Sequence, residues 1–88
     1  MLESTVEERY CRRVKRAKGR AYKFVSPGVR GVPDRLVLYP IPEEHRELVA
    51  KYVQFTELKA PGEKPRPEQI REHKRLRRLG YKVEVVDG

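Results

Sequence analysis

Apolar side chains recur every three or four residues between Leu2 and Ala17, a spacing that predicts a first helix over this stretch. The predicted buried stripe consists of Leu2, Val6, Tyr10, Val14 and Ala17. The opposite face is basic and carries Arg9, Arg12, Arg13, Lys15 and Arg16. Gly19 follows this helix, at the position where a left-handed residue commonly ends one.

Four shorter runs have the alternating or continuously apolar character of strands. They cover residues 21–25, 34–39, 52–59 and 81–86. In the second run, the unbroken apolar stretch from Leu36 to Tyr39 predicts burial on both faces. In the third, side chains alternate along the strand, so one face carries Val53, Phe55, Glu57 and Lys59.

Pro67 and Glu68 suit the first turn of a helix and Gly80 the position after its end, so the sequence predicts a second helix from Pro67 to Leu79. Residues 41–51 form an insert with one or two helical turns, which we expect to be peripheral. The order α-β-β-β-α-β predicts a single α/β domain over residues 1–88, a mixed sheet packed with two helices. The last helix-to-strand step is expected to create a parallel pair.

The net charge of the chain narrows the range of functions that the protein can have. The 88 residues include 21 Lys and Arg against 13 Asp and Glu, a formal net charge of +8. This excess favours a polyanionic partner, and nucleic acid is the leading candidate. No apolar run approaches the roughly 20 residues of a membrane span. We expect no membrane partner and no secretory segment, because the N-terminus lacks an apolar run.

Cysteine and histidine contents narrow them further. Cys11 is the only cysteine, which excludes an internal disulfide and a zinc site of several thiolates, and fits the cytoplasm. His45 and His73 lie far apart without metal-ligand spacing. We therefore expect both histidines at surface or boundary positions, outside the first shell of any metal site.

The strongest chemical signal lies in two successive predicted strands. Pro33-Asp34 heads one strand, and Glu57-Leu58-Lys59 ends the next. If these strands are neighbours, roughly 5 Å apart, Asp34 and Glu57 can share a hard divalent cation, with the Leu58 carbonyl as a further ligand. Such an ion would activate a water molecule that Lys59 could orient or deprotonate, the chemistry of phosphodiester hydrolysis. The alternative, an exposed turn Asp and a surface Glu-x-Lys pair, requires two weak motifs to coincide by chance.

These residues resemble a stand-alone VRR-NUC domain of the PD-(D/E)xK nucleases, over most of the chain. The resemblance lies in the carboxylate-bearing first helix, Tyr22-Lys23-Phe24, Ser26-Pro27-Gly28, Gly31-Val32-Pro33-Asp34-Arg35, Glu57-Leu58-Lys59-Ala60-Pro61, Gln69 and Leu79-Gly80-Tyr81-Lys82-Val83. It implies a restriction-endonuclease-like core, dependence on Mg²⁺ or Mn²⁺, a homodimer, and branched DNA such as four-way junctions as substrate. The insert makes the spacing of 23 positions from Asp34 to Glu57 long for the family, which bears on substrate preference.

Two further site residues are expected, each with an alternative role. Glu7 resembles the helical carboxylate of the family and could complete the metal shell, although Ser4-x-x-Glu7 is also a capping-box pattern. Glu3, one turn earlier, is the reserve candidate. Gln69 is predicted to face inward, so its amide could reach the scissile phosphate or a metal-bound water, or could cap the helix start instead.

Basic residues around the predicted site are candidate phosphate contacts. They are Lys23, Arg30, Arg35, Lys64 and Arg66. For any single one, a solvated surface charge is the simpler interpretation. The basic residues of the first helix and those of the second, Arg71, Lys74, Arg75, Arg77 and Arg78, are expected to follow the DNA backbone rather than to read bases.

The sequence thus predicts a metal-dependent, structure-selective DNA endonuclease of the Holliday-junction-resolvase type, acting as a homodimer in the cytoplasm of a bacterial or phage-infected cell. Two alternatives stay open: a flap- or nick-directed nuclease that acts as a monomer, and a non-catalytic basic module that binds nucleic acid. A decayed nuclease would be expected to lose one of Asp34, Glu57 and Lys59, and all three are present.

Overall fold

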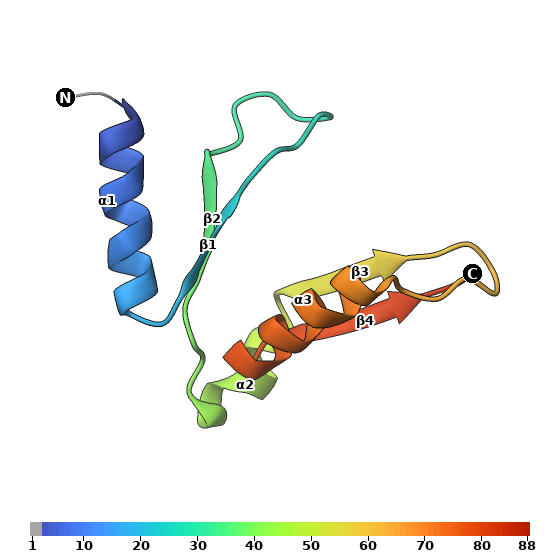
Figure 1. Ribbon diagram of the computed structural model, residues 1–88. Coiled ribbons are helices and arrows are strands. Elements are labelled where there is room, and N and C mark those ends of the chain that lie inside the picture. The colour runs from blue at the N-terminus through green and yellow to red at the C-terminus, as the bar shows by residue number, and fades with distance from the viewer. Residues whose placement is uncertain (1–2) are drawn as a thin grey trace. The chain divides into compact units, whose positions relative to one another are not determined.

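The computed structural model describes residues 3–88, with side chains from Thr5 onwards. Its elements follow in the order α1 (Glu3–Arg16), β1 (Arg20–Lys23), β2 (Arg35–Leu38), α2 (Glu43–Ala50), β3 (Gln54–Leu58), α3 (Pro67–Leu79) and β4 (Lys82–Val86) (Figure 1). They form two compact units, the first ending at Tyr39 and the second beginning at Pro40. Each unit has its own helix packed on its own pair of strands.

The first unit joins α1 to an antiparallel pair of strands. β1 and β2 pair in register from Arg20↔Leu38 to Lys23↔Arg35. A hydrogen bond of 2.8 Å from the Phe24 N–H to the Asp34 carbonyl prolongs this pairing to the residue before β2. α1 lies beside the pair and contacts β1 (Figure 1). Asp34 is therefore held by backbone pairing at the point where the glycine-rich loop enters β2.

The end of α1 differs from the prediction at Gly19. Lys18, not Gly19, is the left-handed residue, with φ of 63°. The Lys18 N–H donates to the Lys15 carbonyl (2.9 Å) and the Gly19 N–H to the Val14 carbonyl (3.0 Å), the pattern of a Schellman motif shifted by one residue. Gly19 is required for a different reason, because a Cβ there would lie 2.9 Å from the Leu38 carbonyl oxygen.

The buried stripe predicted for α1 is wrong in part. Val14 is buried and Tyr10 half-buried as expected, but Val6 is 53% exposed and Ala17 is exposed. Glu7 and Cys11 lie on the covered side instead. The reason is that Glu7 bonds to an arginine of β2, an interaction that apolar periodicity does not register. Leu2, the first residue of the predicted stripe, lies outside the described residues.

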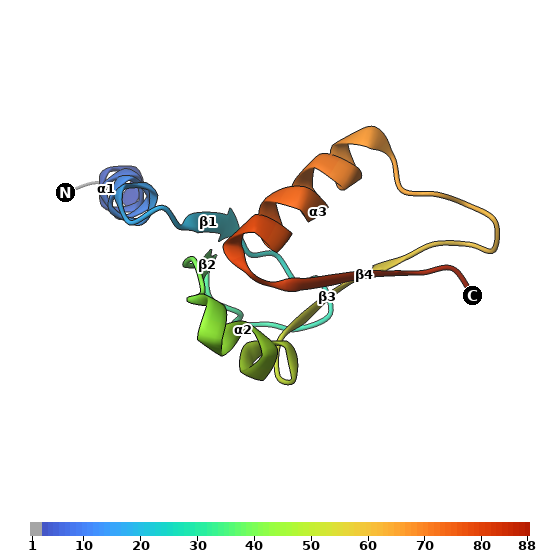
Figure 2. The same cartoon turned by 90° about the horizontal axis from the view of Figure 1, so that it is seen from below.

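The second unit is built on a parallel pair of strands. β3 and β4 pair from Gln54↔Lys82 to Leu58↔Val86. Parallel strands need a crossover connection, and α3 supplies it while lying along one face of the pair (Figure 2). Leu76 and Val83 are buried in this unit. The parallel pair predicted for the last helix-to-strand step is thereby confirmed.

α3 begins and ends where the sequence predicts. Pro67 lies in its first turn, where the missing N–H leaves no helical bond unmade. Gly80 follows the last turn in a left-handed conformation with φ of 105°. The Tyr81 N–H then donates to the Leu76 carbonyl (3.1 Å), which closes the helix and turns the chain directly into β4.

The insert forms α2 and is anchored at its first residue. None of the residues of α2 is buried, in line with the expected helical turns at the periphery. Ile41, just before α2, is buried, and its N–H donates to the Leu79 carbonyl (2.8 Å). Arg46 Nε donates to the Ile41 carbonyl (2.9 Å), which links α2 to Ile41. Through the bond from Ile41 to Leu79, the insert is held at the end of α3.

The α/β class and the predicted element order are confirmed, with α2 added by the insert. All four predicted strands extend beyond the observed ones at one or both ends, and β1 begins one residue earlier than predicted. Burial of the second strand on both faces is wrong at Tyr39, which follows β2 and is 45% exposed. Each strand pairs within its own unit, so the adjacency of β2 and β3 and the single-domain organisation stay predictions. No helix of residues 3–88 has the length and apolar character of a membrane span.

Candidate active site

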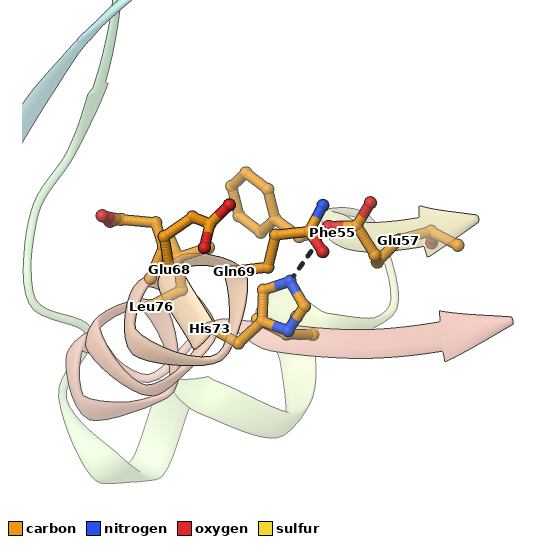
Figure 3. Close-up of a pocket in the computed structure, with 9 residues that line it drawn as sticks. Phe55, Glu57, Glu68, Gln69, His73 and Leu76 are labelled. Carbon is orange, nitrogen blue, oxygen red and sulfur yellow. Dashed lines mark hydrogen bonds and ion pairs between the residues drawn. The ribbon is translucent and has the colours of Figure 1, made fainter. Parts of the chain in front are cut away.

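Glu57 lies on the face of β3 that α3 covers. Phe55, Glu57 and Lys59 are half-buried, whereas the intervening residues of β3 are exposed, so the predicted alternation is confirmed. Glu57 borders a cavity of about 340 Å³ between β3 and α3. Figure 3 shows its carboxylate beside the side chains that α3 contributes to the same cavity, Gln69 and His73 among them.

His73 is the functional candidate that sequence reasoning missed. Its side chain is buried, and its Nε2 lies 3.3 Å from Glu57 Oε1. The expected surface or boundary position is therefore wrong for His73, although His45 is exposed as expected. The signal was the helical spacing, because residues 69, 73 and 76 fall on one side of a helix and that side faces β3.

Gln69 borders the cavity and also caps α3. Its Oε1 accepts a hydrogen bond of 2.9 Å from the Arg66 N–H. Of the two roles left open for Gln69, the helix-capping contact is thus formed. The same side chain also lines the cavity. Capping uses Oε1 of Gln69, whereas the predicted contact with substrate uses its amide nitrogen. The contact with substrate stays a prediction.

Leu58 and Lys59 complete the motif that Glu57 begins. Leu58 is 73% exposed, and the role of its backbone carbonyl as a metal ligand stays a prediction. The Lys59 N–H donates to the Val86 carbonyl (2.8 Å), which continues the parallel ladder beyond β3. This bond fixes the backbone of Lys59, and the alternation of the strand places its side chain on the same face as Glu57.

Glu7 and Asp34 come together in the first unit. Both border a cavity of about 350 Å³ that is also lined by Val6, Tyr10 and Arg35. Glu7 belongs to α1, and Asp34 is the residue that enters β2. The sequence grouped these two carboxylates in one site through the family resemblance and the position of Glu7 on its helix, and both line one cavity in this unit.

Arg35 holds the carboxylate of Glu7. Its Nε and Nη2 donate to Glu7 Oε1 at 2.9 and 2.6 Å, and its Nη1 donates to the Ala21 carbonyl at 3.2 Å. The hydrogen bond with Glu7 raises the pKa of Arg35. Arg35 was predicted as a phosphate contact, and all three of its guanidinium nitrogens donate to protein oxygens in this structure. The side chains of Ser4 and Glu3, on which the capping box and the reserve candidate depend, lie outside the described ones.

The remaining basic candidates lie at the surface. Lys23, Arg30 and Lys64 are exposed. Arg66 is exposed as well, and its Nε lies 2.8 Å from Glu68 Oε1. A hydrogen bond from the backbone N–H of Glu68, with Arg66 nearby, lowers the pKa of Glu68.

The donor set fits a hard divalent cation by its chemistry. Carboxylate, carbonyl and amide oxygens are the ligands that Mg²⁺ and Mn²⁺ take, and no thiolate is among them. Among the described side chains, no three carboxylate, imidazole or thiol groups gather closely enough to hold a metal ion. Asp34 belongs to the first unit and Glu57 to the second, so their convergence on one ion stays a prediction.

Comparisons with known proteins give the family. No family model matches the sequence. The chain is 49% identical over 86 residues to "Putative nuclease p44" of Acyrthosiphon pisum secondary endosymbiont phage 1, covering 98% of this chain and 83% of that protein. A solved structure described as "VRR_NUC domain" is 32% identical, with 98% of this chain and 84% of that chain covered and a TM-score of 0.42.

The sequence identities carry the relation, because they extend over nearly the whole chain and most of each relative. The motif residues Asp34, Glu57 and Lys59 follow one another in the sequence at the start of one predicted strand and the end of the next. The chain belongs to the VRR-NUC family of nucleases.

Proposed function

We propose that this protein is a metal-dependent DNA endonuclease that hydrolyses phosphodiester bonds, with Asp34, Glu57 and Lys59 at its centre. The observation that carries the proposal is the common face of β3, which turns Glu57 and Lys59 the same way and lines a cavity with the Glu57 carboxylate. The name of the phage relative, a nuclease 49% identical to this chain, supports the reaction class.

The carboxylates are proposed to hold the cation. Asp34 and Glu57 would supply one oxygen ligand each, the Leu58 carbonyl a third, and Glu7 a fourth once Arg35 releases it. A bound Mg²⁺ or Mn²⁺ supplies Lewis-acid polarisation of a phosphoryl oxygen and a lower pKa for a coordinated water. Because Arg35 neutralises Glu7 in the absence of a cation, the two positive charges compete for one carboxylate.

Lys59 and Gln69 are proposed to act on the substrate. The Lys59 ammonium group would orient the attacking water and stabilise the charge that develops on the phosphorus-bound oxygens. The amide nitrogen of Gln69 would donate to a non-bridging oxygen while Oε1 keeps its bond to the helix start. Lys23, Arg30 and Lys64 would contact phosphates away from the cleaved bond.

A cleavage assay tests the proposal. The substrates are a four-way junction, a flap, a nicked duplex and a linear duplex, each with Mg²⁺, Mn²⁺ or a chelator. We expect cleavage only with metal, and losses on the order of 10³-fold for Glu57→Gln, Asp34→Asn and Lys59→Met. The matched controls, Glu44→Gln and Lys51→Met, change exposed residues of the insert and should cut like the wild type.

Each outcome separates one alternative. If the folded wild type binds DNA but cuts no substrate with either metal, the non-catalytic binding module is correct and the nuclease proposal is wrong. Preference for the four-way junction supports the branched-DNA substrate, whereas preference for the flap or the nick supports the monomeric alternative. Light scattering gives the mass of the protein in solution, and we expect that of a homodimer. We propose that this homodimer acts on DNA in the cytoplasm of a bacterial or phage-infected cell.

A further inference from the structure

His73 is a buried polar side chain at the edge of the cavity that Glu57 lines. It lies on α3, one helical turn after Gln69 and one before Leu76, and it is 8% exposed. Burial limits the partners that the ring can have, because a buried N–H without an acceptor costs free energy. The contact of 3.3 Å between His73 Nε2 and Glu57 Oε1 satisfies it.

The chemistry of this contact sets the direction of the hydrogen bond. An ionised carboxylate only accepts, so Nε2 must carry the proton and donate to Glu57. The ring is buried and lines the cavity together with Leu76 of α3 and Val83 of β4, which are also buried. A fixed donor on a helix therefore restricts the rotamer of a carboxylate on a neighbouring strand.

We propose that His73 is a positioning residue for Glu57, which it holds through a hydrogen bond from Nε2–H to Glu57 Oε1, so that Oε2 would be left to bind the cation. This inference rests on the proposed function, because it assigns His73 a role in the site where Glu57 is a ligand. Groups that orient a ligating carboxylate commonly change metal affinity by about 10- to 100-fold when they are removed. His73 itself is not a ligand in this proposal.

Three variants separate positioning from packing. His73→Leu keeps the buried volume and removes the donor. His73→Gln keeps a side-chain N–H at about the reach of Nε2. His45→Leu is the matched control, because His45 is the other histidine of the chain and is exposed on α2.

The first measurement is Mn²⁺ binding by calorimetry without DNA, after thermal melting has shown that each variant folds. We expect His73→Leu to weaken Mn²⁺ binding by about tenfold, and His73→Gln and His45→Leu to stay close to the wild type. In cleavage assays, saturating Mn²⁺ should restore the rate of His73→Leu but not that of Glu57→Gln. A residue with a purely structural role would not produce this separation.

The second measurement reads the contact directly. In ¹⁵N spectra of the imidazole nitrogens, His73 should show the Nε2–H tautomer, and Glu57→Gln should shift its Nε2 resonance while leaving that of His45 in place. Equal Mn²⁺ affinity of His73→Leu and the wild type, in a protein that cuts DNA, would overturn the positioning role and leave the nuclease proposal intact. A wild type that neither binds Mn²⁺ nor cuts DNA would defeat the nuclease proposal, and the spectra would still decide whether the contact exists.

Discussion

Gly19 occupies a position where another atom on its Cα has no room. A Cβ would lie 2.9 Å from both the Leu38 carbonyl oxygen and Tyr39 Cδ1, and 3.0 Å from Val14 Cγ1. The first of these contacts is with backbone, which cannot move without disturbing the pairing of β1 and β2. The neighbouring Lys18, by contrast, holds the left-handed conformation that a glycine would adopt at lower cost.

We therefore expect opposite effects from two adjacent substitutions. Gly19→Ala should destabilise the protein by about 1–3 kcal/mol through overpacking. Lys18→Gly should be neutral or stabilising by up to about 1 kcal/mol, because glycine adopts the left-handed backbone conformation without the steric strain that a side chain causes. Thermal unfolding measures both. Gly28→Ala is the control, since no atom lies within 4 Å of a Cβ there, and a Gly19→Ala protein as stable as this control would contradict the packing argument.

For single residues, the sequence predicts the face that a side chain occupies better than it predicts the group that the side chain contacts. Glu57 and Lys59 are found on one face of β3 as expected, because strand alternation is a local property. The burial of His73 and the bond of Arg35 to Glu7 were not predicted, because both depend on atoms distant in the sequence, and a phosphate contact of Arg35 stays a prediction. A sequence pattern predicts that a charged or polar residue faces solvent unless its hydrogen-bonding partner is known.

Among the elements, α3 contributes Gln69 and His73 to the candidate site of its unit, and side-chain contacts hold its first turn. Gln69 accepts from the Arg66 N–H, and Glu68 pairs with Arg66. These contacts fix the first turn, from which Glu68 and Gln69 line the cavity. The stability of the first turn and the activity of the site are consequently linked, and substitutions can separate them.

Gln69→Glu and Gln69→Ala separate the two roles of this residue. Glu keeps the oxygen that caps the helix and removes the amide donor, whereas Ala removes both. We expect Gln69→Ala to lose about 0.5–1.5 kcal/mol of stability and Gln69→Glu to lose much less. Cleavage should fall in both variants. Full cleavage by a stable Gln69→Glu protein would reduce Gln69 to a helix cap.

Glu68 gives the start of α3 a dependence on acid. Because its pKa is lowered in the folded protein from the ordinary value of 4.5, its charge contributes stability above that value, and the contribution is lost as the pH falls through the folded pKa. Glu68→Gln should therefore melt at a lower temperature than the wild type at neutral pH, and the two should converge in acid. A difference that is constant with pH would rule out the charge as its source.

The elements themselves follow from local sequence signals to different degrees. The predicted bounds of α3 are confirmed because proline and glycine mark both ends. The covered face of α1 was misplaced toward Val6 because the stripe was derived from apolar residues alone, whereas the Glu7–Arg35 pair turns the carboxylate inward. Pairing of each strand within its own unit depends on distant residues, which a periodic pattern does not encode.

For the whole molecule, the excess of positive charge governs binding to DNA. The net charge is +8, and Arg71, Lys74 and Arg78 lie along α3. Each phosphate that a basic residue neutralises releases condensed counterions, so the affinity for DNA falls as salt rises. The predicted convergence of Asp34 and Glu57 on one cation also belongs to this scale, since the two residues lie in different units.

Replacing Arg71, Lys74 and Arg78 with Gln should lower DNA affinity equally for all sequences. The slope of log affinity against log salt should become shallower by up to about 0.9 for each phosphate that the variant no longer neutralises. Fluorescence anisotropy at several salt concentrations measures it, with Lys51→Gln as the control. An unchanged slope would mean that this surface of α3 does not follow the backbone of DNA.

The bond from the Lys59 N–H to the Val86 carbonyl also has a consequence during protein synthesis. Glu57 and Lys59 are synthesised before β4, since the strand that pairs with them begins only at Lys82. Until then, both residues belong to an unpaired segment. The backbone that orients these two residues can therefore be fixed only once residue 86 is free to accept the bond.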